Sequence, residues 1–86
     1  MPTISVFYGI IIQMFWDEHA PPHFHARYAE HEVVLDIRTL DVIEGALPRR
    51  AMALVQEWAQ DHRTDLLENW DLCAHRQSPR KIAPLP

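Results

Sequence analysis

Hydrophobic positions in the first half of the chain recur with a period of two, the spacing of side chains on one face of a β-strand. The strand-like segments are residues 3–8, 10–16, 23–28, 32–37 and 40–44. Gly9 interrupts the first two segments, which indicates a bulge or bend, and Gln13 is the one polar residue of the second. The pattern predicts a mainly antiparallel sheet of three to four strands within residues 3–45.

Hydrophobic positions in the second half recur at spacings of three and four, which predicts one long amphipathic helix over about residues 48–75. The apolar stripe consists of Ala51, Leu54, Val55, Trp58, His62, Leu66, Trp70 and Cys73. Pro48 suits the first helical position, because its missing N–H would have no partner there. We expect the helix either to be continuous or to bend near residues 62–64, and residues 77–86 to form an extended tail. A helix packed on one face of such a sheet makes residues 1–86 a single α+β domain.

Two of the alternating segments predict a β-hairpin with Glu30 and His31 as its turn. In that register one face collects six apolar residues, and a slip of one residue would undo this arrangement. They are Phe24, Ala26, Tyr28, Val33, Leu35 and Ile37. The opposite face is not covered by the helix and carries His23, His25, Arg27, Val34 and Asp36. On that face His25 is expected opposite Asp36, with their Cβ atoms about 5 Å apart.

Residues 17–25 concentrate side chains that can carry chemistry. They include three of the six histidines, two carboxylates and two of the seven prolines of the chain. One interpretation is acid–base catalysis, in which His23 or His25 transfers a proton and Asp36 orients the ring. The predicted catalytic residues are therefore His23, His25 and Asp36.

Three further residues are candidates for substrate contacts. Arg27 would hold a developing negative charge, and His19 and Trp16 would line the site. A histidine–carboxylate pair with an arginine is sufficient equipment for metal-independent RNA cleavage. In that reaction a base activates the 2′-hydroxyl and a cation stabilises the phosphorane.

Two other functional interpretations and one structural interpretation compete with catalysis. A metal site would use His23 and His25, two residues apart on one strand, with His19 or Asp17 as the third ligand. Neither a cysteine pair nor an H-E-x-x-H helix accompanies them, and the sequence predicts no cofactor. The other functional interpretation is recognition of an anion or a protein partner. In the structural interpretation the histidines are ordinary polar residues of an exposed strand, and the prolines only end a strand.

Charge and composition limit the classes of partner. The formal net charge is −4, so the chain lacks the clustered cations that coat nucleic acid, and RNA binding is weakly supported. The apolar runs are far shorter than the ~20 residues of a membrane-spanning helix, which predicts no membrane partner. Cys73 is the only cysteine and the N-terminus lacks a basic signal region, so we expect a cytoplasmic location.

Motifs spread over the whole chain resemble one known family. They are Pro2-Thr3-Ile4-Ser5, Phe7-Tyr8-Gly9-Ile10, Glu18-His19, Pro21-Pro22-His23-Phe24-His25, Gly45 with Leu47-Pro48-Arg49-Arg50-Ala51, Glu57-Trp58, Leu67-Glu68-Asn69-Trp70 and Lys81-Ile82-Ala83-Pro84-Leu85. On these motifs the chain resembles the small bacterial proteins grouped as domain of unknown function 4160 (DUF4160). The resemblance implies a cytoplasmic bacterial protein, commonly encoded beside a small cognate protein of the DUF2442 type. Such a layout is typical of a toxin–antitoxin module.

A second, partial resemblance bears on the activity of the chain. The order of histidine-rich strand, second strand, glycine and a helix with arginine in its first turn is similar to the HicA-type mRNA interferase toxins. That resemblance implies a double-stranded-RNA-binding-like fold and a single catalytic histidine, which corresponds to His23 or His25. The chain departs from those toxins in lacking their opening helix and their lysine- and arginine-rich surface.

Two hypotheses of function follow from different classes. The first is a toxin-like component of a two-gene bacterial module, acting as a metal-independent ribonuclease through a strand histidine. The second is a non-enzymatic interaction module whose open sheet face binds a partner protein or a second copy of the chain. A chain of 86 residues buries a small core, so a homodimer would add burial.

Overall fold

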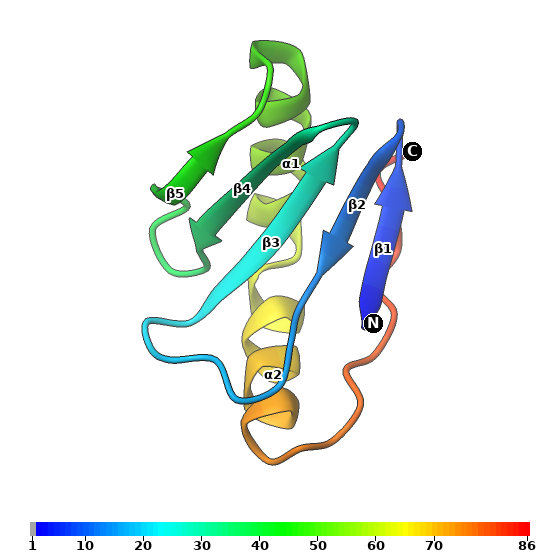
Figure 1. Cartoon of the computed structure of the whole chain (residues 1–86). Coiled ribbons are helices and arrows are strands. Elements are labelled where there is room, and N and C mark those ends of the chain that lie inside the picture. The colour runs from blue at the N-terminus through cyan, green and yellow to red at the C-terminus, as the bar shows by residue number, and fades with distance from the viewer. Residues whose placement is uncertain (1) are drawn as a thin grey trace.

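A computed structural model describes residues 2–86, in which a five-stranded sheet is covered on one face by two helices (Figure 1). The strands are β1 (Thr3–Phe7), β2 (Ile10–Gln13), β3 (His23–Tyr28), β4 (His31–Asp36) and β5 (Val42–Ala46). The helices are α1 (Arg49–Asp61) and α2 (Arg63–Ala74). The strands lie in chain order, and each neighbouring pair is antiparallel. Within residues 2–86, no helix is long and apolar enough to cross a membrane.

The predicted α+β class is confirmed, but the sheet has five strands rather than three or four. Gly9 does not mark a bulge, because Tyr8 and Gly9 both have positive φ values, 50° and 78°. Positive φ at both central residues is the geometry of a two-residue type I′ turn, which here joins β1 to β2. β2 is also shorter than predicted, because it ends at Gln13 and the chain then enters the loop of residues 14–22.

The hairpin of β3 and β4 has a different register from the predicted one. Its turn consists of Ala29 and Glu30, and Ala29 has a positive φ of 53°. His23, rather than His25, therefore lies opposite Asp36. The pairing is displaced by two residues, and an even displacement leaves every side chain on its predicted face.

The predicted single long helix is two helices, separated at His62, where φ is −123° and ψ is 23°. The first residue of α2, Arg63, donates a hydrogen bond from Nε to the carbonyl oxygen of Ile37 at 3.2 Å. This contact holds the start of α2 against the end of the hairpin. The apolar stripe continues across the break, since Trp58 and Leu66 are both fully buried.

The core lies between the sheet and the helices and centres on Trp58. Its ring centroid lies 5.3 Å from that of Phe7 and 6.1 Å from that of Phe24. Its indole Nε1 donates to the carbonyl oxygen of Ala83 at 2.9 Å. The other fully buried hydrophobic residues include Ile10, Ile12, Met14, Val33, Leu35, Ile37, Val55 and Leu66. Burial of each large apolar side chain contributes about 1.5–3 kcal/mol, so this layer is the main favourable term in folding.

The tail after α2 runs beside β1 (Figure 1). The backbone N–H of Ile82 donates to the carbonyl oxygen of Ile4 at 2.8 Å, and Ile82 itself is buried. Asn69 of α2 exchanges two hydrogen bonds with the backbone of Arg80, at 2.8 and 2.9 Å. The tail is therefore extended, as the sequence predicted, and it is fastened through Ile82.

Candidate metal centre

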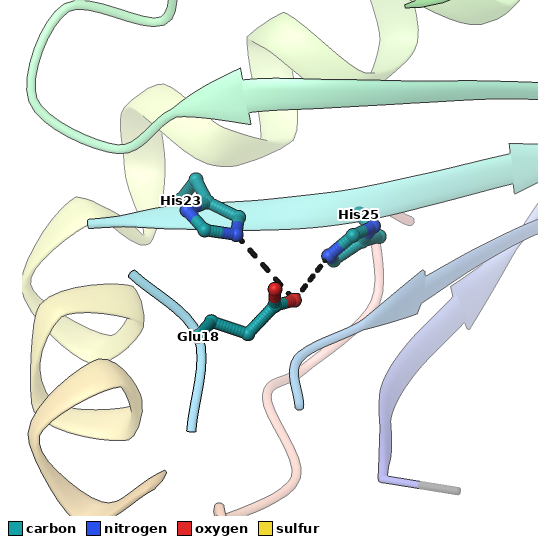
Figure 2. Close-up of side chains that lie close together, drawn as sticks. All are labelled: Glu18, His23 and His25. Carbon is teal, nitrogen blue, oxygen red and sulfur yellow. Dashed lines mark hydrogen bonds and ion pairs between the residues drawn. The ribbon is translucent and has the colours of Figure 1, made fainter. Parts of the chain in front are cut away.

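Two histidines of β3 direct their rings toward one carboxylate from the preceding loop (Figure 2). His23 and His25 are two residues apart on a strand, so their side chains leave the same face. Glu18 approaches from the loop of residues 14–22. Its Oε1 lies 2.6 Å from Nε2 of His25 and 3.4 Å from Nε2 of His23.

The other ring nitrogen of each histidine contacts a hydrogen-bond acceptor. Nδ1 of His23 lies 2.8 Å from the carbonyl oxygen of Pro21, and Nδ1 of His25 lies 3.2 Å from Oε2 of Glu32. A carbonyl oxygen or an ionised carboxylate can only accept, so each ring has an acceptor at both of its nitrogens. A neutral imidazole carries a single N–H, so one nitrogen of each neutral ring then turns a lone pair toward an acceptor. In the tautomer whose Nδ1 donates outward, that nitrogen is Nε2, the one that faces Glu18.

This arrangement calls for positive charge at the point where the three side chains meet. Two Nε2 lone pairs and a carboxylate oxygen cannot satisfy one another, since all three are acceptors. Protons on both Nε2 atoms would resolve the conflict, and so would one cation. The ligand atoms of Glu18, His23 and His25 all lie within 4.8 Å of one another. Bonds of about 2.0–2.1 Å in a tetrahedral zinc site place neighbouring ligand atoms about 3.3 Å apart. The 3.4 Å contact matches this spacing, and the 2.6 Å contact would widen.

Aromatic side chains hold both imidazole rings in place. The Phe15 ring packs edge-on against His25 at 4.8 Å, and Trp70 of α2 packs against His23 at 4.9 Å. The histidine side chains are only 11% and 15% exposed, whereas that of Glu18 is 28% exposed. The ligand nitrogens are therefore shielded by apolar rings, while the carboxylate side of the site stays open to solvent.

The structure brings together His23 and His25, as the sequence predicted. Asp36 lies opposite His23 rather than His25, and its carboxylate is engaged in the turn after β4. One oxygen of Asp36 accepts hydrogen bonds from the backbone N–H groups of Arg38 and Thr39, at 2.7 and 3.2 Å. These bonds fix the turn that follows β4. The carboxylates that contact the histidines are those of Glu18 and Glu32.

The three predicted substrate contacts lie around the site at different places. Arg27 lies two residues beyond His25 on β3, directly opposite Glu32 of β4. His19 lines the hollow beside the candidate centre. Trp16 lies outside that hollow and donates from its indole Nε1 to the carbonyl oxygen of Gln77 at 3.2 Å. Neither His19 nor Asp17 supplies the third ligand of the described group, because Glu18 occupies that place.

Sequence reasoning missed Glu18 and Glu32. The signal for Glu18 was its position five residues before His23 in a proline-stiffened loop, next to the considered candidates Asp17 and His19. The signal for Glu32 was hidden by the register. In the observed pairing Val34 lies opposite His25, so Glu32 is its diagonal neighbour and within reach of a long side chain.

Comparison with known proteins identifies the family of the chain. A family model described as domain of unknown function (DUF4160) matches residues 9–71, from the turn before β2 to α2. The match includes Glu18 and both histidines of β3. No curated protein and no solved structure matches the chain. Because the matched range covers most of the 86 residues and confirms the resemblance read from the motifs, the chain belongs to the DUF4160 family.

Proposed function

We propose that this protein binds a divalent ion of the zinc class through Glu18, His23 and His25 and uses it for hydrolytic chemistry. One observation carries the proposal. Each Nδ1 is engaged by an acceptor outside the group, and each Nε2 faces the same carboxylate oxygen. Metal-binding histidines commonly donate their second ring N–H to a carbonyl or carboxylate in this way, which fixes the tautomer and the ring orientation.

The chemistry of the three ligand side chains restricts which metal ions the site can bind. Two imidazoles with one carboxylate suit zinc and neighbouring first-row ions, whereas magnesium and calcium prefer oxygen ligands alone. Three protein ligands leave one coordination position open, which is typical of catalytic rather than structural zinc sites. A zinc-class ion in such a site polarises a carbonyl or activates water. The chain's own part is to hold the ligands: Glu32 orients His25, while Phe15 and Trp70 fix the two rings.

Titration of metal-free protein with zinc chloride tests the proposal by calorimetry. We expect one ion per chain, and we expect His25→Ala or Glu18→Gln to weaken binding by about 100-fold or more. His75→Ala is the matched control, because His75 is an exposed histidine that lies 3.8 Å from the carboxylate of Asp71. Absence of binding in the wild type, or equal losses in the His75 and His25 variants, would refute the metal centre.

A second candidate is the toxin-like component of a two-gene module, acting on RNA without a metal. The observation that favours it is the 2.6 Å contact between Glu18 and His25, the arrangement of a general base with its orienting carboxylate. Glu18 would then replace Asp36 in the orienting role. The net charge of −4 opposes RNA binding, so the candidate ranks second.

Growth after induced expression tests the second candidate. If wild type arrests growth and the folded His23→Ala/His25→Ala double variant does not, the histidines carry a toxic activity. Purified protein that cleaves RNA in the presence of EDTA would then assign a metal-free mechanism. Rescue by the neighbouring DUF2442-type protein would support the two-gene module.

A non-enzymatic interaction module is the remaining alternative. The sheet carries exposed apolar residues at Val6, Ile11 and Ile43, which a partner or a second copy could cover. This alternative predicts no metal binding and no effect on growth. It also predicts a dimer, or a stable complex with the DUF2442-type protein, in size-exclusion chromatography with light scattering.

A further inference from the structure

The candidate centre opens into a hollow that a small ligand can enter. The hollow has a volume of about 250 Å³ and is lined by Glu18, His19, Ala20, Pro21, His23, His25, Val34, Ile43 and Glu44. All three candidate ligands belong to its wall, so a molecule in the hollow would lie beside an ion that these residues hold. Its volume lies just below the usual range for ligand pockets, about 300–1,000 Å³, so it would hold one residue or a comparably small group.

Part of the wall is apolar. Val34 of β4 and Ile43 of β5 line the hollow from neighbouring strands, and Ala20 and Pro21 line it from the loop. Ile43 is 46% exposed, so a ligand side chain packed against it would remove apolar surface from water. This wall favours a ligand with an apolar side chain.

The side chains around the hollow supply negative charge in addition to that of the ligand Glu18. Glu44 lines the hollow, and Glu44 is paired across the sheet with Val34. Glu32 adds a second carboxylate behind His25, and neither lysine nor arginine lines this hollow. A phosphodiester would bring further negative charge toward Glu44, whereas an ammonium group there would be attracted.

We infer that this hollow is a subsite for the amino-terminal end of a peptide-like ligand. In it a carbonyl oxygen reaches the ion, an apolar side chain packs on Val34 and Ile43, and the free amine lies near Glu44. The inference rests on the proposed metal centre and names its substrate class. It assigns amide-type rather than phosphate-type substrates to the centre.

Titration of the cobalt-loaded protein with three probes tests the subsite, because the visible spectrum of bound Co²⁺ reports a new ligand. The probes are leucine hydroxamate, N-acetyl-leucine hydroxamate and inorganic phosphate. We expect leucine hydroxamate to bind about tenfold more tightly than its acetylated form, as one charge interaction of about 1.4 kcal/mol would give. Phosphate should bind more weakly than either.

Three variants assign the contacts. Glu44→Gln should abolish the preference for the free amine, and Ile43→Ala should weaken both hydroxamates about five- to tenfold. Val42→Ala is the matched control, because Val42 is 49% exposed on the same edge strand but does not line the hollow. Equal effects of the Ile43 and Val42 variants, or phosphate binding as tight as leucine hydroxamate, would overturn the subsite.

The failure of the subsite and the failure of the metal centre give different results. If Co²⁺ binds the wild type but the three probes bind alike, the subsite is wrong and the metal centre stands. If Co²⁺ does not bind, both inferences fall together.

Discussion

The carboxylate of Asp17 forms an ion pair with the guanidinium of Arg76 at 2.9 Å, which joins the residue before Glu18 to the start of the tail after α2. The neighbouring Trp16 donates from its indole to the carbonyl oxygen of Gln77 at 3.2 Å. Two consecutive loop residues are thus fastened to two consecutive residues of the tail. The position of Glu18 over the histidines therefore depends on the C-terminal part of the chain.

We predict that Arg76→Gln weakens zinc binding about two- to fivefold, because an exposed ion pair contributes about 0.2–1 kcal/mol. Trp16→Phe, which removes the indole N–H and keeps a ring, should have an effect of similar size. The measurement is zinc affinity by calorimetry, with circular dichroism to show that each variant is folded. Arg49→Gln, which changes an exposed arginine of α1, should leave the affinity unchanged. Equal affinity of the Arg76 and Arg49 variants would show that the loop does not need its tail contact.

Glu32 should tune the candidate centre through His25 without touching the ion. Its Oε2 lies 3.2 Å from Nδ1 of His25, and its side chain is 50% exposed. Loss of a residue that hydrogen-bonds to a metal ligand commonly weakens metal affinity by about 10–100-fold. Because Glu32 is half exposed, we predict a loss of about tenfold for Glu32→Ala. Glu32→Gln should lose less, because an amide oxygen can still accept the Nδ1 proton.

The control for this prediction is Glu30→Ala, since Glu30 is 84% exposed in the adjacent turn and lies beside His31. Zinc affinities of the three variants, measured in one buffer, test whether Glu32 positions His25. We expect Glu32→Ala to bind zinc most weakly, Glu32→Gln to be intermediate and Glu30→Ala to match the wild type. Any other order of affinities would contradict a positioning role for Glu32.

The faces of the sheet could be predicted from the sequence, but the register of β3 on β4 could not. Alternation with a period of two assigns each residue to a face, and Phe24 and Leu35 are fully buried as that assignment requires. The register depends on which two residues form the turn. Ala29 adopts a positive φ there, and alanine carries no sequence signal for that conformation. The sequence left the helix either continuous or bent near residues 62–64, because the apolar stripe runs through this region without interruption, and the structure has the break at His62.

The two histidines of the candidate site could be predicted from the period of two along a strand, but Glu18 could not. His23 and His25 share a face because they are two residues apart on a strand. The aim of the loop that carries Glu18 is set instead by tertiary contacts, such as the bond from Trp16 to a residue 61 positions later. Local patterns do not report contacts over such separations. Asp36 was placed beside His25 by the displaced register, and that displacement concealed Glu32.

Cys73 gives the stability of the protein a predictable dependence on alkaline pH. Burial raises the pKa of its thiol above the ordinary value of 9.0. As the pH rises past that value, the unfolded chain releases the thiol proton while the folded chain retains it. The folded state then binds more protons, so the free energy of unfolding falls as the pH increases.

We predict that Cys73→Ala makes this fall shallower above about pH 9, although it lowers stability at every pH by leaving a small cavity. Urea unfolding of both proteins at several pH values measures the difference. Parallel curves would show that the thiol does not contribute. The buried thiol should also react slowly with an alkylating reagent until urea unfolds the chain.

Gly45 of β5 lies opposite Val33, close against the backbone of β4. Its φ is +81°, and a Cβ atom built there would lie 2.2 Å from the carbonyl oxygen of Glu32. We predict that Gly45→Ala lowers the free energy of unfolding by about 3 kcal/mol or more, since the contact is with backbone and cannot be relieved by a rotamer change. The same displacement would move Glu32, so the zinc affinity of any folded Gly45→Ala protein should fall as well.

Gly9→Ala separates the steric effect from the cost of a positive φ. Gly9 has a φ of +78°, but the nearest atom to its Cβ position is the side-chain Cε1 of Tyr28 at 3.4 Å, an ordinary contact. This variant should lose only about 1–2 kcal/mol, the cost of left-handed backbone for alanine. Gly9 lies in the β1–β2 turn, so zinc affinity should be unchanged. Urea unfolding gives the two stabilities and calorimetry the two affinities. Equal losses of stability in the two variants would mean that β5 can shift away from β4. Unchanged zinc affinity in Gly45→Ala would mean that metal binding does not depend on the position of Glu32.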